Sequence, residues 1–149
     1  MIPEATIENA ITKLSESREE VETRFLENHR IFFDYLHNEI LSALEDDLQA
    51  QLIFYITIIH ESCFLANGSL PPFSLEDYAE NEDNNWRTTE KNSNWEETVN
   101  FFFRDYPEED LLAFVEDMLS EIDGSEKNTA STEVIFIVAK SYIDTVCSV

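Results

Sequence analysis

Histidine is the side chain best suited to acid–base or metal chemistry near neutral pH, and this sequence has three. His60-Glu61 invites comparison with the zinc-protease pattern, in which two histidines four residues apart flank a glutamate. The second histidine would have to stand at position 64, which is Phe64, so the motif is absent. We therefore expect His60 to be a hydrogen-bonded core or rim residue. We expect Glu61 to point to solvent or to a basic partner.

A second candidate is the pair Asp34 and His37, which would share one face of a helix. Helical di-metal sites use a carboxylate and a histidine at this spacing, but on two helices and with further glutamates facing them. The chain offers the pair once, and one such coincidence is expected among 32 acidic residues. A metal site built from Asp34, His37 and His60 therefore remains an alternative that requires these groups to converge. No cofactor is predicted.

The segment Asp77–Asn85 is rich in oxygen atoms that could bind cations. It lacks the glycine and the alternating ligand spacing of an EF-hand loop. Weak calcium binding by clustered charge is possible there, and the simpler interpretation is a solvated acidic segment. The residues proposed to contact a partner from this segment and beside it are Asp77, Glu80, Glu82, Asp83 and Trp86.

Covalent catalysis finds no support in the sequence. No serine or cysteine lies in a recognisable nucleophile motif, and the two glycines, Gly68 and Gly124, are too few and too isolated for a phosphate-binding loop. Cys63 and Cys147 do not have the spacing of a metal motif. We interpret both as small buried thiols in a reducing compartment. The chain is therefore predicted not to be an enzyme.

The net charge of −23 arises from nine basic and 32 acidic residues. Such a surface repels phosphate backbones and anionic lipids, so nucleic acids and membranes are excluded as partners. Basic proteins would be attracted. The alternative is that the charge serves only to keep the protein in solution.

The elements that would position these residues are predicted to be helices, because two glycines and four prolines cannot supply the turns of an all-β domain. The segment 48–66 is apolar on nearly every face, which is typical of a helix buried in the middle of a domain. Gly68 is placed to end it. An aspartate of Glu45-Asp46-Asp47 is expected to cap its start.

Upstream of this central helix, no proline or glycine interrupts residues 4–66. One helix of that length would measure roughly 95 Å, far more than a domain of this size can hold. We expect two breaks. The first is predicted at Asn28 or within 15–17, and the second at 45–47.

Downstream, residues 69–94 lack helical periodicity and are predicted to form a long acidic loop, with at most a short helical turn at 74–79. Asn94 and Glu97 have the spacing of a capping box. Pro107 is expected to open a further helix and Gly124 to end it. The segment 132–149 has the β-branched residues of a strand, but its length and periodicity favour a helix.

The predicted protein is one all-α domain over 1–149, a bundle of five or six helices around the central apolar helix. The absence of a basic and then apolar N-terminus, and of an apolar run of about 20 residues, predicts a cytoplasmic protein. The predicted function is non-enzymatic binding of a protein with a basic surface. A concrete form is an inhibitor or immunity-type protein that occludes the basic cleft of a nucleic-acid-acting enzyme. A third possibility is a structural homodimer subunit.

Overall fold

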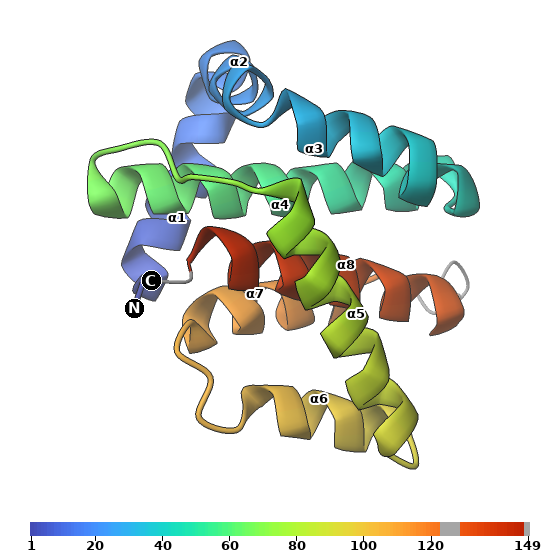
Figure 1. Ribbon diagram of the computed structural model, residues 1–149. Coiled ribbons are helices and arrows are strands. Elements are labelled where there is room, and N and C mark those ends of the chain that lie inside the picture. Colours follow the sequence, from blue (N-terminus) through green and yellow to red (C-terminus); the bar gives the residue numbers. More distant parts are fainter. Residues whose placement is uncertain (123–128, 148–149) are drawn as a thin grey trace.

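All regular structure in the described part of the chain, residues 1–122 and 129–147, is helical, and this confirms the predicted all-α class. The computed structural model is shown in Figure 1. Its α-helices in these ranges are α1 (Glu4–Glu16), α2 (Arg18–Asn28), α3 (Arg30–Tyr35), α4 (Asp46–Asn67), α5 (Leu75–Lys91), α6 (Trp95–Phe103), α7 (Glu109–Ser120) and α8 (Thr129–Val146). A π-helical turn over Leu36–Ile40 and a 3₁₀ turn over Leu41–Ala43 continue α3.

Helix α4 packs against α1 and α2 and, on another side, against α8. Its residues from Tyr55 to Cys63 are all buried, and they include the polar residues Thr57, His60, Glu61 and Ser62. Gly68 ends the helix as predicted: it takes the left-handed conformation, with φ 70°, and its N–H donates to Phe64 O over 2.9 Å. The helix start differs from the prediction. Glu45 is the cap residue and makes no side-chain cap bond, while both aspartates lie inside the first turn, where the positive helix end attracts them.

Helix α4 has 22 residues, which is longer than the apolar run judged from the sequence. By length and composition it is the one helix in the described residues that could cross a membrane. However, 61% of its apolar window is buried inside the protein. The central helix of a protein core can be as apolar as a helix that spans a membrane, so the composition of α4 does not identify it as a membrane segment.

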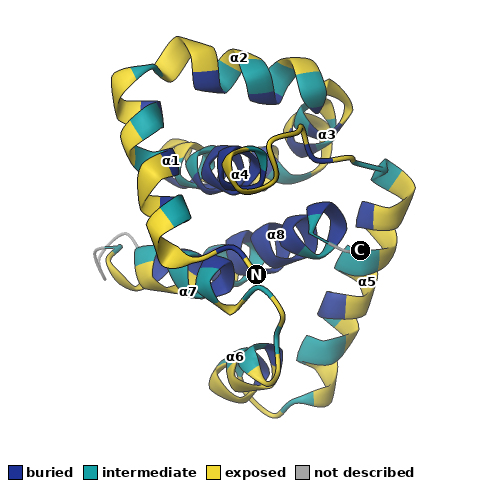
Figure 2. Cartoon of the chain, turned by 90° about the vertical axis from the view of Figure 1, so that its left-hand side faces the viewer, coloured by how far each residue is buried: buried dark blue, intermediate teal, exposed yellow. Residues whose placement is uncertain are grey.

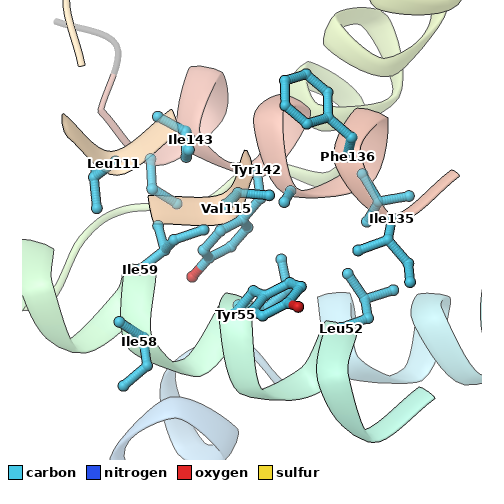
Figure 3. Packing of buried hydrophobic residues seen from close by; sticks show 14 of the residues in the cluster. Leu52, Tyr55, Ile58, Ile59, Leu111, Val115, Ile135, Phe136, Tyr142 and Ile143 are labelled. Atoms are coloured by element: carbon cyan, nitrogen blue, oxygen red, sulfur yellow. The ribbon is translucent and has the colours of Figure 1, made fainter. Parts of the chain in front are cut away.

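The last segment is a helix, α8, as predicted, and it packs on α4, α5 and α7. Figure 3 shows its Ile135, Phe136, Tyr142 and Ile143 among side chains of α4 and α7. Every residue from Ile135 to Ile143 is buried. Its β-branched residues are tolerated in a helix because tertiary packing outweighs their slightly low helix propensity.

The N-terminal half breaks more often than predicted. Breaks occur at one candidate position and next to the other. Ser17, with φ −140°, separates α1 from α2, and His29, one residue after Asn28 and with φ −125°, separates α2 from α3. A further break at Leu44, with φ −113° and ψ 148°, precedes α4. The three breaks let short helices fold back over α4 (Figure 1).

The predicted acidic loop over 69–94 is wrong for most of its length, since Leu75–Lys91 is helix α5. Ser74 caps it, with Oγ accepting from Asp77 N over 3.2 Å. Its inner face carries asparagines in place of aliphatic residues, and this conceals the helical period. Asn81 donates to Thr145 Oγ1 over 3.0 Å and Asn85 to Ser141 Oγ over 2.9 Å, so hydrogen bonds join α5 to α8.

The capping prediction for α6 is confirmed, because Asn94 Oδ1 accepts from Glu97 N over 2.9 Å. Helix α7 begins at Glu109, two residues after Pro107, with Glu108 as its cap residue. Glu108 also accepts from Ile2 N over 2.8 Å, which ties the start of the chain to α7. Gly124, the predicted end of α7, lies outside the described residues.

Candidate functional surface

Three of the predicted partner-binding residues lie together on the outer face of α5. Asp77, Glu80 and Asp83 are all exposed, and they follow one another at intervals of three residues. At 1.5 Å rise per residue, they extend over about 9 Å of the helix. Figure 2 shows exposed residues along much of α5. The result is a short acidic ridge, which we define as Asp77, Glu80 and Asp83.

The other two predicted residues of this set point toward the protein. Glu82 accepts hydrogen bonds from Tyr35 Oη over 3.1 Å and from Tyr78 Oη over 2.8 Å. Burial and the neighbouring Glu82 raise the pKa of both phenols, so both remain donors. Trp86 is half-buried and packs on the hydrophobic core. Glu82 and Trp86 therefore fix α5 to the rest of the fold and leave the ridge to carry the exposed charge.

The acidic ridge has no counter-ion within the described part of the chain. In those residues, salt bridges engage only the acids Glu20, Glu22, Glu61 and Asp144. Further exposed acids on α6 and α7 add to the negative potential. These are Glu96, Glu97, Glu109, Glu116 and Asp117. Basic side chains on α5 itself, Arg87 and Lys91, lie toward its other end.

The predicted metal ligands do not converge. Asp34 and His37 lie at the surface, and His37 Nδ1 is 3.2 Å from Phe33 O in the preceding turn. His60 is fully buried on α4. Within residues 1–122 and 129–147, no group of three or more histidine, cysteine, aspartate or glutamate side chains is placed to hold a metal ion.

His29 and His60 were not predicted to meet, but their rings lie with centroids 4.8 Å apart in an edge-to-face arrangement. His29 Nε2 is 3.1 Å from Pro71 O and His29 Nδ1 is 2.8 Å from Tyr142 Oη. A carbonyl oxygen only accepts, so Nε2 carries the proton and Nδ1 accepts from the tyrosine. The partners come from three separate segments, which explains why no sequence spacing indicated them.

Both imidazoles are held neutral. Asn28 Nδ2 donates to His60 Nε2 over 2.9 Å, so the proton of His60 is on Nδ1, which has no hydrogen-bond partner among the described residues. Burial lowers the pKa of His29. Burial, with smaller contributions from His29 and Arg24, lowers the pKa of His60 to about 3. We define Asn28, His29, His60 and Tyr142 as the imidazole cluster.

Glu61 corrects a prediction made from the sequence. Its side chain is fully buried, and its carboxylate pairs with Arg24 of α2 over 3.0 and 3.2 Å. Arg24 also lies over the Phe64 ring, 4.3 Å from its centroid. The basic partner of Glu61 is therefore inside the chain, and this ion pair joins α2 to α4.

A second cluster of buried polar side chains surrounds Lys140 of α8, and it was not predicted from the sequence. Lys140 Nζ donates to Asp144 Oδ2 over 2.8 Å and to Asn85 Oδ1 over 3.0 Å. Tyr106 Oη donates to Asp144 Oδ1 over 2.5 Å, and the ammonium group also faces the Phe102 ring. We define Asn85, Tyr106, Lys140 and Asp144 as the lysine cluster. It joins α5, α8 and the segment that follows α6, and its charges are satisfied internally.

An apolar groove of about 450 Å³ opens between α1, α2, α3 and α4. The charged residues among those that line it are Glu22, Asp46 and Arg18. A lining of mixed sign attracts no one class of charged partner. The acidic ridge differs in presenting a single sign, and this makes it the stronger candidate for recognition.

Comparison with known proteins finds no matching family model, no similar curated protein and no similar solved structure.

Proposed function

We propose that this chain is a non-enzymatic acidic module that binds a basic surface on another protein. The observation that supports this most directly is the acidic ridge on α5, whose three carboxylates are exposed and lack an internal counter-ion in the described residues. Lysine and arginine side chains of a partner would replace the missing counter-ions. Complementary charge speeds association and selects the orientation of the partner.

The attachment of α5 supports the proposal further. The hydrogen bonds of Asn81 and Asn85 to α8, and of Glu82 to Tyr35 of α3, hold the helix from its inner face. In this proposal the bundle around the central helix α4 serves as a rigid scaffold for the ridge. A ridge that is already ordered loses little conformational freedom when it binds, so more of its interaction energy appears as affinity.

A specific form of the proposal is an inhibitor that covers the basic cleft of a nucleic-acid-acting enzyme. The net charge of −23 supports this partner class because the same charge opposes direct binding to nucleic acid or to anionic membranes. A protein that itself binds phosphate presents the opposite sign. The inhibitor would act by occupying that surface, without chemistry of its own.

The test uses a triple variant of the ridge, Asp77→Asn, Glu80→Gln and Asp83→Asn. The control is Glu8→Gln, Glu16→Gln and Glu19→Gln, which removes the same charge from exposed positions on α1 and α2. Each protein is used as bait in cell lysate at about 50 mM and about 500 mM NaCl, and bound proteins are identified by mass spectrometry.

We expect a partner that wild type and the control retain at low salt, and that the ridge variant and high salt both release. A partner retained equally by the ridge variant would overturn the role of the ridge. Capture that does not respond to salt would overturn the electrostatic mechanism itself.

A further inference from the structure

The two cysteines of the chain, 84 residues apart in sequence, meet in the fold. Cys63 lies in the last turns of α4 and Cys147 directly follows α8, and their Sγ atoms are 3.4 Å apart. Both are free thiols. The packing of α4 on α8 already brings the two backbones together.

At this distance the two sulfur atoms are in non-bonded contact, with no other atom between them. A disulfide has an S–S length of about 2.05 Å, so closure needs the two sulfur atoms to approach by about 1.4 Å. We propose that Cys63 and Cys147 are a site of oxidative modification that closes to an intramolecular disulfide between the C-terminal ends of α4 and α8. The acidic ridge takes no part, so this proposal does not depend on the proposed function.

The two thiols differ in access. Cys63 is fully buried, whereas Cys147 is half-buried and lines a surface pocket together with Ile2, Ala66 and Asn67. A small reagent from solvent therefore meets Cys147 first. Cys63 is then placed behind it to resolve the intermediate.

The oxidant we assign is a low-molecular-weight disulfide such as oxidised glutathione. The Cys147 thiol loses its proton and the thiolate attacks one glutathione sulfur, which forms a mixed disulfide and releases one glutathione thiolate. The Cys63 thiol then loses its proton and attacks Cys147 Sγ, which releases the second glutathione thiolate. The two cysteines lose two protons and two electrons in total, and one glutathione disulfide is reduced to two thiols.

The environment sets the speed of the first step. The hydrogen bond with Cys63 and burial raise the pKa of the Cys147 thiol. The thiolate is the nucleophile, so closure is slow at neutral pH and accelerates as pH rises. A site of this kind responds to sustained oxidation and is indifferent to brief exposure.

Closure links the two most buried helices of the fold and closes a long loop. In the chain-entropy model, a bridge across 84 residues strongly restricts the unfolded chain. We expect the melting temperature of the oxidised protein to exceed that of the reduced protein by about 5–10 °C.

The experiment incubates the folded, reduced full-length chain with oxidised glutathione, blocks free thiols with an alkylating agent under denaturing conditions, and measures intact mass. We expect a monomer lighter than the reduced, unalkylated chain by about 2 Da, the mass of two hydrogens, with no alkyl groups attached. Cys63→Ser should accumulate the mixed disulfide at Cys147. Cys147→Ser should remain reduced at Cys63 for longer than wild type takes to close. Cys63→Ala repeats the first variant without a buried hydroxyl, in case serine disturbs folding.

Three results would overturn the proposal. A glutathione adduct that persists in wild type would show that Cys63 does not resolve it. A disulfide-linked dimer would place the bond between chains. An oxidised monomer that melts below the reduced protein would show that the bridge does not fit the native packing.

Discussion

The lysine cluster and the imidazole cluster both place polar groups in the core, but they satisfy them in opposite ways. In the lysine cluster the buried Lys140 forms an ion pair with Asp144 at 2.8 Å, surrounded by donors and acceptors. In the imidazole cluster, burial keeps two titratable rings neutral. The first cluster therefore depends on a partner for each charge, and the second depends on the absence of charge.

Both clusters attach surrounding segments to α8. Lys140 and Asp144 form hydrogen bonds with Asn85 of α5. Tyr142 donates a hydrogen bond to His29, which lies at the break between α2 and α3. The difference between the clusters can be measured as a difference in how each responds to mutation and to pH.

The largest effect is expected from Asp144→Asn, which leaves the Lys140 ammonium buried without a counter-charge. Removing one partner of a buried ion pair costs about 3–5 kcal/mol. The free energy of unfolding, measured by urea denaturation at neutral pH, should fall by this amount. The matched control Asp83→Asn lies on the exposed face of α5 and should change it by less than about 0.5 kcal/mol. A similar small loss for Asp144→Asn would mean that the ion pair is dispensable.

The second effect concerns pH and belongs to the imidazole cluster. The pKa of His60 is lowered to about 3 in the folded protein, against about 6.5 in an unfolded chain. Between these values the unfolded state binds more protons. The contribution of His60 is therefore fully present above pH 6.5 and is lost as pH falls toward 3, by on the order of 3 kcal/mol at pH 4. The measurement is urea denaturation as a function of pH.

Carboxylates also titrate in this pH range. The informative quantity is therefore the difference between wild type and His60→Leu in how the free energy of unfolding depends on pH. This variant removes the ring while Asn28 keeps its second hydrogen bond, to Pro71 O. Its stability should decline less steeply with acid than that of wild type. His37→Leu, at an exposed histidine, should follow wild type. If the free energy of unfolding changed with pH in parallel for wild type and His60→Leu, this result would contradict a lowered pKa at His60.

A smaller effect is expected at the start of α5. Ser74→Ala removes the acceptor for Asp77 N and should cost about 1 kcal/mol. Asn94→Ala at the start of α6 should cost a similar amount, since it removes the equivalent bond to Glu97 N. Thermal unfolding would measure both. No change in the serine variant would indicate that α5 is held by α8 alone.

The sequence predicted helices where the core-facing side chains are apolar. Residues 48–66 and the C-terminal segment carry enough aliphatic side chains for burial to be inferred directly, and both are helices as predicted. Helix α5 was missed because Asn81 and Asn85 face the core in place of aliphatic residues. A polar inner face becomes recognisable only when its hydrogen-bonding partners on α8 are known.

The predictions of site residues show the same difference between information that is local in the sequence and information that depends on tertiary packing. Local charge density identified Asp77, Glu80 and Asp83, which are exposed, but it could not show that Glu82 would turn toward two tyrosines. Pairings between distant segments, such as His29 with His60 and Cys63 with Cys147, depend on tertiary packing. No spacing rule for a single segment contains that information.

The most direct test of the acidic ridge is the salt dependence of affinity for the captured partner, measured by calorimetry between about 50 and about 200 mM NaCl. We expect the affinity of wild type for this partner to fall steeply as the salt concentration rises. The affinity of the control Glu8→Gln, Glu16→Gln, Glu19→Gln should fall in the same way. The ridge variant Asp77→Asn, Glu80→Gln, Asp83→Asn should bind more weakly and with a flatter slope. Equal slopes and affinities for the ridge variant and the control would contradict the assignment of α5 as the binding surface.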